Sequence, residues 1–247
     1  DYSAAGQMAT VVQHYWSLSV EEQFYLAWPL LILGAAFVAG KLVPRASIDR
    51  RGFSGPGTRR LFLVAIGAIM LLSFAYGLWV TTANPSAAYF DTAGRAWEFA
   101  AGGVLALLCV NRGVGGLRGA LLGWGGLALL LAGALLIPTE TRFPGTMALV
   151  PVLGTAAMLA AAGTQRPGVR WFSHATWLSI HPVRRVGDVS YGAYLWHWPL
   201  IIVAPFVLHG EPKWYHEAGI LGLALLLAWL SQLLIEDPLR FGKMLKP

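Results

Sequence analysis

The chain has 247 residues, of which 56% are hydrophobic and 12% are charged, and its mean hydropathy is +0.58. Soluble domains carry about 25% charged residues, so this composition excludes an ordinary soluble domain and favours an integral membrane protein. The net charge of +6 is spread among the segments between apolar runs, a distribution that does not indicate a nucleic-acid partner, and the single cysteine excludes an internal disulfide.

Seven apolar runs follow one another along the chain, and most are long enough to cross a bilayer, which takes roughly 17 to 25 helical residues. The predicted helices are 24–43, 61–81, 96–111, 120–138, 146–163, 190–208 and 218–235. The third run is short unless its helix begins near Thr92. No run alternates with a period of two residues, so strands are not expected. We predict an all-α polytopic membrane bundle with a single membrane domain over residues 1–247.

Basic residues predict the orientation of these helices. If the loops after the first, third, fifth and seventh runs face the cytoplasm, they hold every lysine and arginine except Arg95, Arg142 and Lys213. This asymmetry is the positive-inside pattern, with the first residue outside and the last residue in the cytoplasm. Residues 1–23 contain no cationic region followed by an apolar signal core that would carry them across the membrane.

A polar and aromatic stretch precedes the first apolar run and contains His14, Ser17, Glu21 and Glu22. The spacing of Ser19 and Glu22 matches a capping box at a helix start, which would give one acid a purely structural role. Interfacial tryptophan and tyrosine are also common anchors, so the structural explanation is favoured by composition alone. The remaining polar side chains are candidates for chemistry at the membrane surface.

Arg95 and Glu98 begin the third run and are three residues apart, hence on one helical face. An ion pair between them would lessen the cost of placing Glu98 in the membrane, so a local salt bridge is as good an explanation as a substrate contact. Carboxylates inside a membrane are nevertheless functional candidates by default.

The sixth run places His197 roughly 10 Å into the membrane, counted from Ser190 at 1.5 Å per residue. Tyr194 and Ser190 share its helical face. A neutral imidazole beside a tyrosine is either simple packing or the free base that proton abstraction requires. Pro199 would loosen the helix and free backbone carbonyls for other partners. No group of residues has metal-ligand spacing, so no metal site is expected.

Seven strings occur in an order that resembles the membrane acyltransferase-3 family. They are Trp16-Ser-Leu-Ser-Val-Glu-Glu-Gln-Phe-Tyr25, Arg95-Ala-Trp-Glu98, Phe143-Pro-Gly145, Pro151-Val-Leu-Gly-Thr155, Gly187-Asp-Val-Ser-Tyr191, Tyr194-Leu-Trp-His-Trp-Pro-Leu200 and Ile235-Glu-Asp-Pro-Leu-Arg240. The resemblance implies an inner-membrane enzyme that transfers an acyl group, often acetyl from coenzyme A, to hydroxyls of a surface polysaccharide, lipopolysaccharide or lipid-linked saccharide. Acyl-CoA would be a co-substrate, and no bound cofactor is expected.

The resemblance also implies site residues and an incomplete helix set. His197 and Glu22 are expected to be catalytic, and the acceptor is expected to contact His14, Ser17, Glu21, Arg95, Glu98 and Tyr194. Basic residues on the cytoplasmic side would attract the donor nucleotide, namely Arg59, Arg60, Arg184 and Arg185, although such residues are topology signals first. Family members have about ten helices, so the first three and the principal catalytic histidine are expected to be absent and this chain alone inactive.

Two other classes of protein share some of these features. A transporter or flippase for an acyl group or glycan would also carry an intramembrane histidine and outer carboxylates. A seven-helix receptor matches the helix count and orientation, but the order of the seven strings argues against it. Thioester-dependent labelling of an acceptor separates an enzyme from a transporter.

Overall fold

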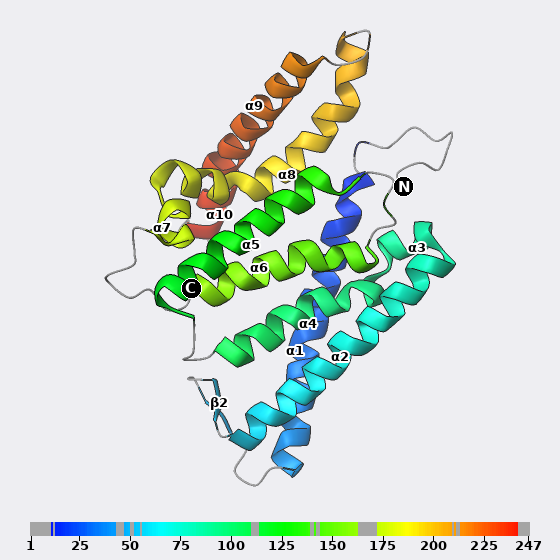
Figure 1. Ribbon diagram of the computed structural model, residues 1–247. Coiled ribbons are helices and arrows are strands. Elements are labelled where there is room, and N and C mark those ends of the chain that lie inside the picture. Colours follow the sequence, from blue (N-terminus) through cyan, green and yellow to red (C-terminus); the bar gives the residue numbers. More distant parts are fainter. Residues whose placement is uncertain are drawn as a thin grey trace. The chain divides into compact units, whose positions relative to one another are not determined.

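The computed structural model describes residues 11, 13–42, 47–49, 52–54, 56–109, 114–138, 141, 144–162, 172–208, 210 and 213–241. The chain divides into two compact units (Figure 1). The larger unit comprises residues 18–177, and the smaller unit comprises residues 1–17 and 178–247. Helix α1 (Trp16–Leu42) begins in the smaller unit and continues in the larger one.

In the described part of the larger unit, all regular structure is helical except for one short hairpin. Its elements after α1 are β1 (Ser47–Asp49), β2 (Gly52–Ser54), α2 (Pro56–Ala83), α3 (Pro85–Phe90), α4 (Thr92–Cys109), α5 (Gly116–Leu136), the 3₁₀ turn η2 (Thr146–Ala148) and α6 (Leu149–Ala162). The sequence predicted no strands, and β1 and β2 pair antiparallel in a polar segment between two apolar runs. Each strand has three residues, so the fold class remains all-α.

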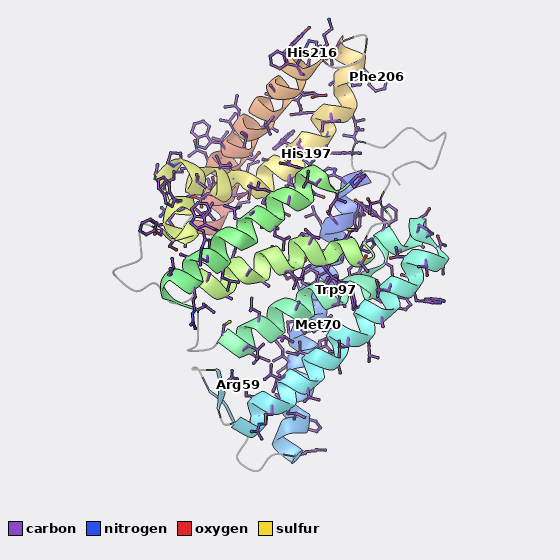
Figure 2. All side chains as sticks on the ribbon, viewed as in Figure 1. Arg59, Met70, Trp97, His197, Phe206 and His216 are labelled. Carbon is purple, nitrogen blue, oxygen red and sulfur yellow. The ribbon has the colours of Figure 1, made fainter. Side chains whose placement is uncertain are left out.

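Helices α2 and α4 pack closely because a glycine of each faces the other. A Cβ added at Gly77 would lie 2.6 Å from the carbonyl oxygen of Gly94, so no larger residue fits without displacement. Ser73 on α2 donates a hydrogen bond to the carbonyl of Ala93 and accepts one from the backbone N–H of Trp97. Figure 2 shows Trp97 and Met70 on this pair of helices.

Helices α5 and α6 pack in the same way. Added Cβ atoms at Gly126 and Gly154 would each lie within 3 Å of the other glycine's carbonyl oxygen. Small residues that let helix backbones approach are typical of membrane helix interfaces, where apolar side chains gain little by leaving lipid. Gly123 on α5 receives the ring of His174, which belongs to the short helix α7 (His174–Leu178).

The smaller unit contains η1 (Gln13–Tyr15), α8 (His181–Leu208), α9 (Trp214–Ser231), the π-helical turn η4 (Gln232–Glu236) and α10 (Asp237–Phe241). Helices α8 and α9 touch where Gly192 faces Ala228. The indole N–H of Trp196 on α8 also donates to the hydroxyl of Ser231 on α9 at 3.0 Å. Helix α8 continues through Pro199, which leaves the carbonyl of Leu195 without its usual helical donor.

Four helices in the described part of the chain are long and apolar enough to cross a membrane. They are Gly57–Ala83, Gly116–Leu136, His181–Leu208 and Trp214–Leu239, and Thr146–Ala162 is a shorter apolar helix. The predicted class, an all-α polytopic membrane protein, is confirmed, while the predicted count of seven spans stays a prediction. The helix containing the third run begins at Thr92, four residues before the predicted start at 96 and at the position that would make the run long enough.

All seven predicted helix starts differ from the starts of the α-helices in the structure, and the differences are largest for α1 and α8. Helix α1 begins at Trp16, so Ser19 lies inside the helix, and the capping box predicted from Ser19 and Glu22 is wrong. Helix α8 begins at His181, nine residues before the apolar run that predicted it. Hydropathy marks where a helix becomes apolar, whereas the helix itself extends into polar residues that can also adopt helical geometry.

Candidate active site

The smaller unit brings together four of the residues predicted from separate parts of the sequence. The backbone carbonyl of His14 accepts a hydrogen bond from the Tyr194 hydroxyl at 3.0 Å and another from the Ser17 hydroxyl at 3.1 Å. The two hydroxyl oxygens also lie within hydrogen-bond distance of each other, so their two hydrogens are shared among these three contacts. The ring of His14 lies 5.2 Å from the ring of Tyr194 and 5.7 Å from that of His197, measured between centroids.

Among the described residues, His197 hydrogen-bonds through one ring nitrogen and leaves the other available. Its Nδ1 lies 2.6 Å from the backbone carbonyl oxygen of Tyr194, one turn earlier on α8, and Figure 2 shows His197 on this helix. Because a carbonyl can only accept, Nδ1 carries the hydrogen of this bond. In the neutral ring Nε2 then keeps its lone pair, which is the arrangement a general base requires.

His14 is the second imidazole at this site and is buried, with 2% of its surface exposed, whereas His197 is half-buried. Neither of its ring nitrogens makes a hydrogen bond within the described residues. Burial lowers the pKa of His14 below 6.5, and repulsion from His197, when that ring is protonated, lowers it further. The backbone carbonyls of Tyr194 and Leu195 lie near the ring and offset part of this effect, although neither meets the geometry of a hydrogen bond. Leu195 is the residue whose carbonyl Pro199 leaves without a helical donor. The neutral form of His14 is therefore favoured.

The lowered pKa of His14 makes the stability of the protein depend on pH. Below pH 6.5 the unfolded chain binds a proton at this residue more readily than the folded protein does. The contribution of His14 to stability is therefore fully present above pH 6.5 and is lost as the pH falls toward the lowered folded-state value. In thermal unfolding of the purified protein between pH 7.5 and 5.5, we expect His14→Asn to show a smaller decrease in Tm than the unmodified chain. An equal decrease in both would contradict this assignment.

Trp198 belongs to the same site and was not predicted as a site residue. Its ring lies 6.0 Å from that of His14. Trp198 is four residues after Tyr194, so the two side chains occupy one face of α8. From that spacing Trp198 could have been considered together with Tyr194, although the spacing alone does not indicate the contact with His14.

Arg95 and Glu98 form the predicted ion pair in the larger unit. The Nη2 and Nε atoms of Arg95 each lie 3.4 Å from an oxygen of the Glu98 carboxylate, and about one fifth of each side chain is exposed. The pair occupies the first turns of α4, whose start is stabilised by the Asp91 carboxylate accepting the backbone N–H of Gly94 at 2.7 Å. The ion pair is thus held on a helix with a well-defined beginning.

Among the described residues, the other predicted ones make none of the contacts given for these two groups. Glu21 is half-buried and Glu22 is exposed on α1, in the larger unit. Arg59 donates from Nε to the carbonyl of Leu107 at 3.0 Å and so stabilises the carboxyl end of α4. The other three predicted donor-binding residues have exposed side chains. Arg60 lies on α2, and Arg184 and Arg185 lie on α8.

These features define a helical membrane protein in which a buried histidine and a half-buried one lie beside two hydroxyl groups. The chain belongs to the acyltransferase-3 family, because the family's acyltransferase domain matches residues 2–233. The predicted family is therefore confirmed over nearly the whole chain.

The names of proteins with similar sequences agree with this family assignment. The chain is 29% identical to a protein of Komagataeibacter xylinus described as a membrane-bound transacylase, over 90% of this chain and 50% of that protein. It is 29% identical to a protein of Bacillus subtilis described as a peptidoglycan O-acetyltransferase, and 26% identical to an O-acetyltransferase of Staphylococcus aureus. These two matches each cover 93% of this chain, and 34% and 36% of the relatives. The chain thus spans between a third and a half of the length of these relatives. No solved structure matches it.

Proposed function

We propose that the protein acts in the transfer of an acyl group, in particular acetyl, from an acyl-CoA donor to hydroxyl groups of a cell-surface glycan or lipid-linked saccharide. The family membership and the O-acetyltransferase relatives support the reaction class. The single observation of the structure that supports it best is the geometry of His197. Its Nδ1 is bound to a carbonyl of its own helix, so Nε2 is free to accept a proton.

The proposed reaction forms an oxygen–carbon ester bond and breaks the sulfur–carbon bond of the thioester. The acceptor hydroxyl loses its proton as it attacks the acyl carbonyl, and the coenzyme A thiol leaves with a proton. His197 takes part in this proton transfer, with His14 beside it kept neutral by burial. Tyr194 and Ser17 offer hydroxyl groups that can bind acceptor oxygens next to the imidazole.

Further residues have proposed roles at the two substrates. Glu22 is proposed to be catalytic, and Glu21 is proposed to bind the acceptor together with the Arg95–Glu98 pair. Arg59, Arg60, Arg184 and Arg185 are proposed to attract the anionic donor. The protein is proposed to lie in the plasma membrane with the first residue of this chain outside and the last in the cytoplasm, as the basic residues indicate.

Membrane vesicles carrying the product of the gene that encodes this chain test the proposal. Acetyl-CoA labelled in the acetyl group is expected to transfer label into the glycan fraction as an alkali-labile ester, and Glu22→Ala is expected to lose this transfer while Ser19→Ala, an exposed neighbour on α1, keeps it. Labelled material that crosses the membrane without forming an ester would instead indicate a transporter. Absence of ester with verified expression would overturn the proposal.

A further inference from the structure

A cleft of about 320 Å³ lies between α4 and α6 of the larger unit. Its lining residues occur at helical spacing, so each helix contributes one face. Arg95 and Glu98 form its polar end, and the residues beyond them are small or apolar, including Gly102 and Leu105 on α4 and Thr155 and Leu159 on α6. The cleft therefore has one charged end and an apolar body. This arrangement complements an amphiphilic molecule.

The length of the cleft matches one leaflet of a bilayer. Arg95 and Leu105 are ten residues apart on α4, which corresponds to about 15 Å at the helical rise per residue. The hydrocarbon core of a bilayer is about 30 Å thick, so a lipid tail in one leaflet extends over about the same distance. An extended hydrocarbon chain thus fits the cleft with its head group at the Arg95–Glu98 end.

The charges at the polar end favour a particular head group. Arg95 supplies N–H donors and Glu98 supplies carboxylate acceptors, and together they carry no net charge. Sugar hydroxyls both donate and accept, so they complement this pair, whereas a bare phosphate would be repelled by Glu98. The same pair was proposed above to bind the acceptor.

We infer that the cleft between α4 and α6 binds the hydrocarbon chain of a lipid whose saccharide head group contacts Arg95 and Glu98. This inference rests on the proposed function, since it identifies the acceptor of that reaction as a lipid-linked saccharide. The chain in the cleft would hold the sugar at the membrane surface and restrict its motion during transfer.

A glycine in the cleft provides the test. A Cβ added at Gly102 meets no atom within 4 Å, so a side chain placed there enters open space and fills the cleft. Gly125 on α5 is equally open and does not line the cleft, so it is the matched control. The full protein in lipid nanodiscs is exposed to an alkyl glycoside with a photoreactive group in its chain, and the labelled peptides are mapped.

We expect the glycoside to label α4 and α6 around Gly102 and Thr155, with at least a tenfold loss in Gly102→Leu and no change in Gly125→Leu. Gly102→Ala, which adds a single methyl group, is expected to show a smaller loss of labelling. This variant replaces Gly102→Leu in the test if the leucine variant fails to fold. Labelling that is insensitive to Gly102, that maps elsewhere, or that a photoreactive phospholipid reproduces equally would overturn the inference. Because no acyl donor is present, this labelling reports on the cleft separately from the reaction. Intact labelling of a protein that forms no ester in the vesicle assay with labelled acetyl-CoA would remove the proposed function and leave the cleft assignment standing.

Discussion

Replacement of His197 by alanine is expected to lower acyl transfer to the glycan by a factor of about 10² to 10⁴, the usual contribution of a positioned general base. The structural reason is that His197 is the imidazole whose Nδ1 is bound by the Tyr194 carbonyl and whose Nε2 is left to accept a proton. The measurement is the initial rate of ester formation in vesicles with equal amounts of folded protein.

Two further variants separate chemistry from folding. His181→Ala changes an exposed histidine at the start of the same helix and is expected to keep the full rate. His197→Gln keeps a hydrogen-bonding side chain of similar length but lacks a basic nitrogen, so it is expected to stay folded and inactive. If His197→Gln retains most of the rate, His197 does not transfer the proton and its role is to pack against His14.

Replacement of Gly126 by alanine is expected to destabilise the pair of helices α5 and α6 by about 1 to 3 kcal/mol, the usual cost of overpacking. The added Cβ would lie 2.5 Å from the carbonyl oxygen of Gly154 and 3.0 Å from the side chains of Ala157 and Met158. A backbone oxygen cannot move aside as a flexible side chain can, so the helices must separate. Thermal unfolding in detergent measures the decrease in stability.

The neighbouring glycine is the control for this prediction. A Cβ at Gly125 meets nothing within 4 Å, so Gly125→Ala is expected to leave stability unchanged or to raise it slightly, because alanine favours the helical backbone more than glycine does. Equal effects of the two substitutions would show that the glycines act through helix propensity and that the close contact with Gly154 contributes nothing.

The sequence predicted much of the fold because membrane helices follow simple rules. Long apolar runs with few charges must form helices in lipid, since every backbone N–H and C=O needs a partner there. Each of the seven predicted runs accordingly lies largely within a described helix, although the helix starts differ from the predicted ones. The ion pair of Arg95 and Glu98 was predictable as well, because residues three apart share a helical face.

Other features depended on interactions that no local pattern contains. The start of α1 at Trp16 was missed because the spacing of Ser19 and Glu22 matches a cap that the helix does not use. The hairpin of β1 and β2 was missed because each strand has only three residues. Trp198 was not recognised as a site residue because its role depends on its distance from His14, far away in sequence.

By itself, then, the amino-acid sequence determined that this protein is an all-α membrane protein of the acyltransferase-3 family and which polar residues deserve testing. Hydropathy, helical spacing and short ordered strings are local properties of the sequence, so they can be identified without knowledge of the fold. Only the tertiary structure decided that His14 and Ser17 meet Tyr194 and His197, and that α4 and α6 leave a cleft with Arg95 and Glu98 at one end. Such contacts join residues up to 183 positions apart, as the numbers of His14 and His197 show (197 minus 14), and the packing of helices against one another sets them.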